Sequence, residues 1–573
     1  MKKFLLLLML VISVSFMTCD GNEGDTGGGT YIINFDANAG EGGQTTPVTA
    51  TYGQPMPPLT ASVPTRDDYF FTGYFDAETD GTKYYNADLT SARDWDKKEN
   101  TKLFAQWSLY IAGLPDENSI VALVRAPSSI TNASQFDEAS IKALVTEAVD
   151  LAGGLTGIVK AGDTVVLKPN LITTIYGWSE NNAPENRIPE TVNGVCTDYR
   201  VVKAVSELVR EIIGPTGKIL VMEGSGKGST QVHFDNAGYT PENLPEVDEI
   251  IPLDDEGTWD DSENSSFVTE VQLNDYRYKM DSINEKYRNN GVYYVNKKMY
   301  DADALICLPV VKNHWDAVVT GAIKNISIGA APPRVYGISE YDVGRNNMVD
   351  HGTIYFHQWI ADYYSCLPAD FVIMDGLQGC EKGPLPGGTL SNLQAAQKNL
   401  RVILASKDAL AIDTVETNII NWDFETVKYL EYLTERGNVG VAPKPVKTVR
   451  GNPKNITVRG NIKVDDIRTD FEGNFPMSGG NKLTAAQKAQ PSVSIASSSV
   501  FTGQNLMLNL NLSPDTVKVE VDIDGSFTGS FSENLNNLFF DTSAIDGGSH
   551  QITVRAYTKY MRSNTTSATI VKQ

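Results

Sequence analysis

The sequence predicts a multidomain α/β plus β protein, with a central, mostly parallel α/β sheet domain and a smaller β module on either side. Strand and amphipathic-helix patterns alternate between residues 119 and 480, as expected for βαβ units. Short strands and turns precede this region, and strands of alternating apolar residues follow it. The length of 573 residues also exceeds what one hydrophobic core usually organises.

The N-terminus has the pattern of a secretory signal peptide over residues 1–18. Two lysines precede an apolar run that is too short to span a bilayer. Because this run ends at Cys19, before a glycine-rich linker that completes residues 19–29, it resembles a bacterial lipoprotein signal. The resemblance implies a lipid anchor on Cys19 in a bacterial membrane, and an ordinary cleaved signal is the alternative. Either signal predicts export to the cell envelope.

The net charge argues against a nucleic acid partner, and the cysteine spacing argues against two kinds of metal centre. A formal net charge of -23 repels nucleic acid phosphates, so we expect no nucleic acid partner. The sequence has no C-x-x-C motif, so we expect neither an iron-sulfur cluster nor a structural zinc knot. The sequence leaves open whether the cysteines beyond Cys19 form disulfides; they are Cys196, Cys307, Cys366 and Cys380.

Residues 30–108 contain short strands rich in glycine, aspartate and aromatic side chains. The segments Phe35-Asp36, Tyr52-Gly53, residues 71–75 and residues 103–107 resemble the Listeria-Bacteroides repeat, a β-grasp-like module of bacterial surface proteins. At the other end, a linker at 481–490 leads to alternating apolar residues over 491–573, which predict an immunoglobulin-like β-sandwich. We expect both modules to act as spacers or to bind a protein or glycan partner.

The central region places polar residues where predicted strands end. We expect strands at 120–124, 164–167, 218–222, 304–308, 371–374 and 401–405, and helices at 137–151, 199–213 and 409–420. Open α/β sheets bind ligands at the carboxyl ends of their strands. Lys168, Asn170, Glu223 and Asp375 stand at such ends, so we predict that they contact substrate or take part in catalysis.

The densest group of polar residues follows the predicted strand 304–308. Lys312, His314, Thr320, Lys324 and Asn325 occur within fourteen residues of chain. We expect Lys312, His314 and Lys324 to be catalytic, together with Asp375, and Thr320 and Asn325 to bind substrate. Two glycines further along allow close approach of backbone to a ligand and are predicted to line the same site; they are Gly383 and Gly387.

Three of the five histidines occur within a stretch of 44 residues, and they are candidate ligands for a divalent metal. These are His314, His351 and His357, with Asp375 as a further ligand.

The order of these motifs resembles the family numbered 362 among the domains of unknown function, over residues 119–480. The motifs include Lys168-Pro169-Asn170, Glu223-Gly224-Ser225, the 312–325 group and Asp375-Gly376. The family has no assigned activity, so the resemblance implies a fold and a site but no reaction.

A more distant resemblance is to the nickel-dependent lactate racemases, in which a histidine and a lysine ten residues apart hold a nickel-pincer nucleotide. His314, Thr320-Gly321 and Lys324 match that spacing. A chain exported unfolded would not carry over a cofactor assembled on the folded protein, so we expect no nickel-pincer nucleotide.

Two classes of function remain. In the first, the protein is an exported enzyme: its lysines neutralise an anionic small molecule, and His314 acts as acid, base or metal ligand with Asp375 as partner. In the second, it is a non-catalytic surface protein for binding or adhesion. The first class requires that the groups after Leu308 meet Asp375 in one crevice.

Overall fold

A computed structural model of the protein describes most of the chain in two compact units, Met1–Ala112 and Gly113–Gln573, which we treat separately. The described residues are 29–61, 63–66, 69–79, 81–86, 89–109, 120–179, 181–254, 266–278, 291–336, 354–436, 438–439, 447–448, 456–473, 480–496, 500–501, 505–543 and 545–572. The predicted signal peptide and Cys19 lie outside them. Among the described residues, no helix has both the length and the apolar character needed to cross a membrane.

The first unit is a five-stranded sheet in the order β2-β1-β5-β3-β4. Its strands are β1 (Thr30–Asp36), β2 (Val48–Thr51), β3 (Tyr69–Phe75), β4 (Lys83–Tyr85) and β5 (Thr101–Leu109). Tyr74, Tyr85 and Trp95 are buried in its core, as a small module needs large aromatic side chains to exclude water. The repeat family expected here remains a prediction.

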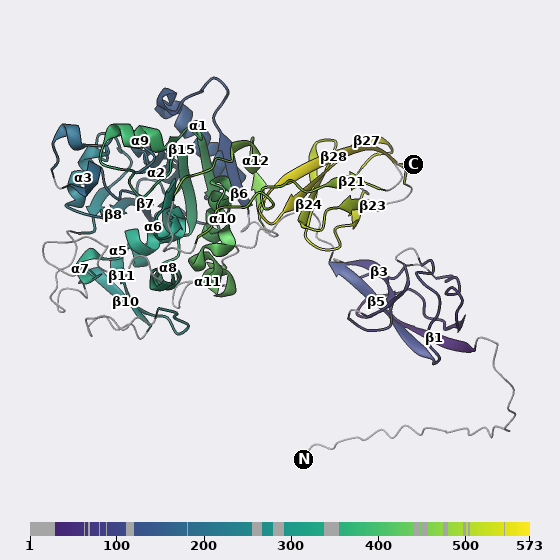
Figure 1. Cartoon of the computed structure of the whole chain (residues 1–573). Coiled ribbons are helices and arrows are strands. Elements are labelled where there is room, and N and C mark those ends of the chain that lie inside the picture. The colour runs from purple at the N-terminus through teal and green to yellow at the C-terminus, as the bar shows by residue number, and fades with distance from the viewer. Residues whose placement is uncertain are drawn as a thin grey trace, which may run out of the picture. The chain divides into compact units, whose positions relative to one another are not determined.

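The second unit is built around one large mixed sheet (Figure 1), whose main path runs β20-β6-β17-β15-β12-β7-β8-β9. These strands are β20 (Thr457–Arg459), β6 (Ile120–Arg125), β17 (Val402–Ser406), β15 (Phe371–Cys380), β12 (Ala304–Leu308), β7 (Thr164–Pro169), β8 (Lys218–Glu223) and β9 (Glu249–Pro252). The run from β15 to β9 is parallel throughout, whereas β17 is antiparallel to both of its neighbours.

Helices cover both faces of this sheet, so its strands are buried on both sides. Alternate residues of β6 divide between two cores: Leu123 belongs to one cluster and Val124 to the other. On the face of Val124 lie α1 (Glu138–Leu151) and α2 (Tyr199–Ile213). On the face of Leu123 lie α6 (Gly321–Gly329), α8 (Ile354–Cys366), α10 (Ala409–Ile419) and α11 (Lys428–Arg436).

The other helices and strands of the α/β region are short. They are α3 (Thr230–Asn236), β10 (Val268–Gln272), β11 (Val292–Asn296), α5 (Lys297–Asp301), β13 (Val310–His314), β14 (Val318–Val319), α7 (Pro333–Tyr336), α9 (Leu390–Ala396), β16 (Gln397–Lys398), β18 (Asn438–Val439), β19 (Lys447–Thr448) and α12 (Val464–Ile467).

Residues 310–314 form a strand that the sequence analysis did not predict. The chain passes Pro309 and continues as β13, which pairs in parallel with β15 and antiparallel with β14. Strand β15 is correspondingly longer than expected, because its second half provides the partner for β13. Lys312 and His314 are therefore held at fixed positions in a sheet.

The C-terminal region forms two sheets around one core, in the orders β21-β23-β26 and β22-β28-β27-β24-β25. Its strands are β21 (Val493–Ile495), β22 (Val500–Phe501), β23 (Asn505–Leu512), β24 (Thr516–Ile523), β25 (Ser526–Phe531), β26 (Asn537–Asp541), β27 (Gly548–Thr558) and β28 (Ser563–Lys572). The region contacts the α/β elements directly, since Lys518 donates to the carbonyl of Ile456 and Ser563 to the carboxylate of Asp465. Its immunoglobulin-like class remains a prediction.

Candidate functional site

Lys168, at the end of β7, is fully buried and bound to groups of the protein itself. Its ammonium group forms an ion pair with the Glu223 carboxylate and donates to Asn325 Oδ1 at 3.1 Å and to the carbonyl of Pro169 at 2.8 Å. The side chain of Lys168 is 0% exposed and that of Glu223 2%. Lys168 and Glu223 thus join two adjacent parallel strands at their carboxyl ends.

Lys312 extends the same network from β13. Its ammonium group donates to Asn170 Oδ1 at 2.8 Å and to the carbonyl of Val195. Asn170 in turn donates through Nδ2 to Asn325 Oδ1 at 3.1 Å. Burial lowers the pKa of Lys312 to about 8, because the charged form has lost its water.

Five predicted site residues therefore come together, but in a closed structure. They are Lys168, Asn170, Glu223, Lys312 and Asn325, and all are buried. Buried charges persist when their partners satisfy them, as here. We call this group the buried polar network; it ties strands β7, β8 and β13 to helix α6.

The N-terminus of α6 is capped by a carboxylate from α10. Asp413 accepts hydrogen bonds from the backbone N–H groups of Ala322 at 2.6 Å and Ile323 at 3.1 Å. Gly321 permits this approach, since a Cβ there would lie 2.4 Å from the Asp413 carboxylate, and its φ is +53°. A helix N-terminus attracts anions, and here the protein supplies its own.

Asp375 lies apart from His314 and Lys324 in its contacts. One carboxylate oxygen accepts from the backbone N–H of Asp198 and the other from that of Leu377, both at 2.9 Å. Burial raises the pKa of Asp375 to about 7, and the nearby charge of Asp198 adds to the shift. Through Asp198, the N-cap of α2, this carboxylate holds the segment that leads into that helix.

His314, Lys324 and Phe356 form a second group, which we call the His314 cluster. The His314 ring stacks on Phe356 with centroids 6.2 Å apart, and Lys324 Nζ lies 5.9 Å from the centroid of the same ring. His314 Nδ1 accepts from the backbone N–H of Asp316 at 3.1 Å, so the neutral imidazole carries its proton on Nε2.

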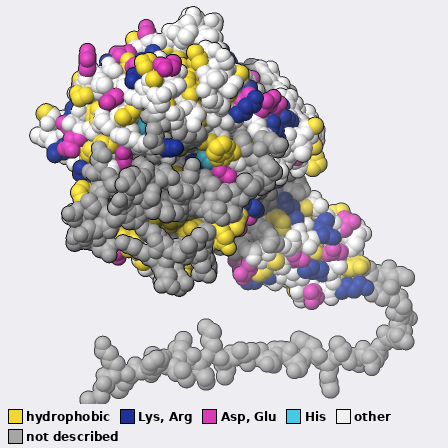
Figure 2. All heavy atoms as spheres, turned by 60° about the vertical axis from the view of Figure 1, so that its left-hand side comes forward, with side chains coloured by type: hydrophobic (Ala, Val, Ile, Leu, Met, Phe, Trp, Pro, Cys, Tyr) yellow, Lys and Arg dark blue, Asp and Glu magenta, His cyan; other side chains and the backbone are white. Residues whose placement is uncertain are grey.

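The three side chains of the His314 cluster are themselves buried, with exposed fractions of 0–4%, but the cluster borders an exposed residue. Trp315 is 44% exposed directly beside His314. Burial raises the pKa of the Asp316 carboxyl, and the positive charge of Lys324 opposes that shift, which places the two groups close together. On the face drawn in Figure 2, histidine side chains lie among basic, acidic and exposed hydrophobic side chains.

The predicted metal ligands do not assemble among the described residues. His357 packs by stacking on Tyr429, with centroids 5.7 Å apart, while His314 stacks on Phe356. His351 lies outside the described residues. Within the described part of the chain, no group of three or more His, Cys, Asp or Glu side chains is arranged to hold a metal ion. The described donors alone do not make a ligand set.

The glycines and threonine of the predicted site have distinct positions. A Cβ at Gly383 would lie 2.0 Å from the carbonyl of Asn313, so this glycine serves the close packing of its loop on β13. Gly387 has a φ of +59° and lies against Asn392. Thr320 is 2% exposed, and its hydroxyl has no hydrogen-bond partner among the described residues, which leaves a polar group at the start of α6 for a ligand or water.

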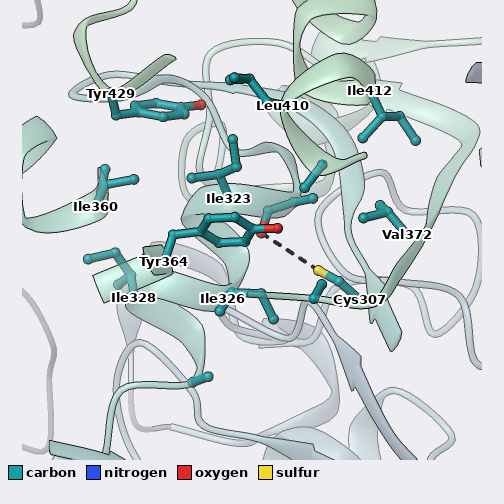
Figure 3. Packing of buried hydrophobic residues seen from close by; sticks show 14 of the residues in the cluster. Cys307, Ile323, Ile326, Ile328, Ile360, Tyr364, Val372, Leu410, Ile412 and Tyr429 are labelled. Atoms are coloured by element: carbon teal, nitrogen blue, oxygen red, sulfur yellow. Dashed lines mark hydrogen bonds between the residues drawn. The ribbon is translucent and has the colours of Figure 1, made fainter. Parts of the chain in front are cut away.

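None of the four described cysteines forms a disulfide, and all are buried. Cys307 on β12 faces α6, where its thiol lies 3.7 Å from the carbonyl of Ala322 among Ile323 and Ile326 (Figure 3). Burial raises the pKa of this thiol to about 12, so it stays protonated and is a poor nucleophile. The same holds for Cys196 and Cys380, whose thiol pKa values burial also raises to about 12.

Sequence reasoning did not find three residues that shape these groups. Phe356 is the ring on which His314 and Lys324 converge, and Asp316 supplies the nearby carboxyl. Glu416 accepts from the backbone N–H of Lys312 at 3.0 Å. Glu416 follows Asp413 by three residues, and this spacing indicates two carboxylates on the same face of one helix. No comparable signal in the sequence indicates Phe356.

Comparison with known proteins supports the domain assignment. The model of the family described as "Domain of unknown function (DUF362)" matches residues 165–418. The curated protein named "Thylakoid-associated protein sll1697", from Synechocystis sp. (strain ATCC 27184 / PCC 6803 / Kazusa), is 26% identical over 300 residues, which cover 52% of this chain and 76% of that protein.

Likenesses to solved structures are distant. The lactate racemase apoprotein from Thermoanaerobacterium thermosaccharolyticum matches at 12% identity and a TM-score of 0.28, over 60% of this chain and 62% of its own. The fibronectin(III)-like modules of CbhA from Clostridium thermocellum match at 24% identity and a TM-score of 0.13, over 15% of this chain and 47%, about half, of theirs. The chain therefore contains a DUF362 domain, predicted from its motifs and confirmed over residues 165–418.

Proposed function

We propose that this protein is an exported, lipid-anchored protein of the bacterial cell envelope whose α/β domain binds a small molecule with an anionic group at the His314 cluster. The signal-like N-terminus and Cys19 support the location. The observation that carries the binding proposal is the convergence of His314 and Lys324 on Phe356, beside the exposed ring of Trp315.

The chemistry of the cluster suits an anion with an apolar or flat body. Lys324 supplies a positive charge, and His314 carries a donor on Nε2. Both are nearly buried, at 4% and 3% exposure, so a charge brought to them is poorly screened by water. An imidazole and an ammonium group beside one another are also groups that can act in acid and base catalysis. A divalent metal is the further option of this proposal, and it requires ligands from residues outside the described part of the chain.

The alternative is a non-catalytic surface protein for binding or adhesion. The contacts of Lys168 and Lys312 favour it, because both ammonium groups are satisfied by neighbouring protein groups. A domain that keeps its fold but has no accessible cationic site is expected to have such protein-bound lysines at the ends of β7 and β13. In that case the two β regions would carry the binding of proteins or glycans.

Ligand-induced thermal shifts of the full mature chain separate these proposals. The probes are a panel of phosphate esters and small carboxylates, tested against His314→Ala and Lys324→Ala. We expect either substitution to weaken binding about tenfold or more, since a hydrogen bond to a charged group contributes roughly 1.5–3 kcal/mol. Lys297→Ala and His550→Ala are matched controls, because they remove the same groups from surface ion pairs elsewhere.

Unchanged thermal shifts in both His314→Ala and Lys324→Ala would refute binding at the cluster. Binding lost equally in the two control variants would point to a general charge effect. Metal content of protein extracted from the envelope tests the metal option by itself.

A further inference from the structure

A cavity of about 240 Å³ lies where the C-terminal sheets meet the edge of the central sheet. Strand β20 and helix α12 form one wall, and strands β24 and β27 form the other. The cavity shares no lining residue with the His314 cluster, which lies on β13, α6 and α8. Its volume equals that of roughly eight water molecules of about 30 Å³ each, and is smaller than the sites that hold drug-sized ligands.

This junction cavity has a mixed lining, with apolar and charged residues from both walls. Ile456, Val458 and Met561 provide an apolar side. Lys518, Arg555 and Tyr557, all from the C-terminal strands, provide a polar side. A pocket that offers both apolar and polar contacts suits a ligand with an apolar body and a polar group.

The polar wall is held in place by a buried carboxylate. Glu520 accepts from Lys518 Nζ at 2.7 Å and from the Tyr557 hydroxyl at 2.6 Å. Lys518 also lies over the Tyr557 ring, 4.4 Å from its centroid, and donates to the carbonyl of Ile456. Glu520 thereby neutralises Lys518 and fixes its position, so Arg555 is the cation of the C-terminal strands that can contact a ligand in the cavity.

Arg555 has hydrogen-bonding capacity that the described residues leave unused. Its Nη1 lies 3.5 Å from the Tyr557 hydroxyl and 3.7 Å from Glu520, both long contacts. Its Nε has no hydrogen-bond partner among the described residues. The charges of Glu520 and Asp522 act on the guanidinium, and Lys463 and Asp466 also line the cavity.

We propose that the junction cavity binds a small monocarboxylate with an apolar body. The carboxylate would take the planar guanidinium of Arg555 as its partner, since this group matches a carboxylate with two parallel hydrogen bonds. The apolar body would lie on Ile456, Val458 and Met561. Such a ligand bridges the α/β domain and the C-terminal region, so its binding strengthens their association.

Titration of the full mature chain with butyrate and benzoate tests this proposal, with butyramide and benzamide as uncharged ligands of the same shape. Thermal shift and calorimetry are the readouts. We expect the acids to bind and the amides to bind at least tenfold more weakly. Arg555→Gln should weaken the acids about tenfold or more, which corresponds to the 1.4 kcal/mol of one decade in affinity.

Val458→Trp tests the cavity from the opposite wall, in case Arg555→Gln does not fold. It should fill the space and abolish binding of both acids. Arg459→Gln is the matched control, since Arg459 neighbours Val458 on β20 without lining the cavity. His314→Ala should leave this binding unchanged, which separates it from the proposed site on β13.

Three results would overturn the proposal: no binding of either acid at millimolar concentration, equal binding of acids and amides, or unaltered binding by Arg555→Gln and Val458→Trp.

Discussion

Lys312 and His314 stand two residues apart on the same strand, yet they belong to different kinds of environment. Lys312 enters the buried polar network, where its charge is met by Asn170 and a backbone carbonyl. His314 enters a cluster that borders the exposed Trp315. The difference teaches that two polar residues near the end of one buried strand can enter different groups of side chains, and that packing between elements decides which group each one joins.

Breaking the ion pair of the buried polar network should have the largest effect. Lys168→Met leaves the Glu223 carboxylate buried without its cation, which costs about 3–5 kcal/mol of stability. Urea unfolding of the full chain measures it. Adding Glu223→Gln should recover part of the loss. If Lys168→Met costs less than about 1 kcal/mol but abolishes ligand binding, Lys168 belongs to a binding site instead.

Removing the cap of α6 should have the next largest effect. Asp413→Ala leaves the N–H groups of Ala322 and Ile323 without their acceptor, and we expect a loss of about 2–3 kcal/mol in thermal or urea unfolding. Asp408→Ala is a useful comparison, because Asp408 caps its own helix, α10, through Leu410 and Ala411. A loss confined to ligand binding, with stability intact, would contradict the structural role of Asp413.

The pH dependence of stability tests whether Asp375 has a structural role, as the residues of the buried polar network do. The folded carboxyl has its pKa raised to about 7, whereas the unfolded one ionises near 3.8. As pH rises from 5 to 7, the unfolded chain has lost this proton and the folded chain still holds it, so stability falls by on the order of 2 kcal/mol.

Asp375→Asn should flatten this profile in urea unfolding at several pH values. The flattening is only partial, because burial also raises the pKa of Asp413 to about 7, with the same sign. An Asp375→Asn profile as steep as that of the unchanged protein would exclude Asp375 as a source of the dependence.

Lys324→Met should have the smallest effect on stability, below about 1 kcal/mol. Methionine keeps the apolar stem against Phe356 and removes the positive charge that acts on the Asp316 carboxyl. Thermal unfolding measures the change, and the binding assay should show a loss alongside it. A cost similar to that of Lys168→Met would mean that the His314 cluster is also structural, and the contrast between the two groups would disappear.

Much of the fold could be predicted from the sequence. The helix expected at 199–213 and the strand at 304–308 have the expected bounds, since their apolar spacing reflects burial directly. The sequence analysis did not predict strand β13, because a proline such as Pro309 is expected to end the preceding strand. In the structure, the residues just after Pro309 pair with β15. That partner is distant in sequence and leaves no local signal.

The sequence by itself determined which residues gather at the carboxyl ends of the strands, because strand pattern and polar residue type are local properties. Lys168, Asn170, Lys312 and Asn325 do meet there. Only the tertiary structure decided that these groups satisfy one another, that Asp375 binds backbone near α2, and that His314 and Lys324 converge on Phe356. Side-chain partners are set by packing between elements far apart in the chain, and no pattern within one segment encodes that choice.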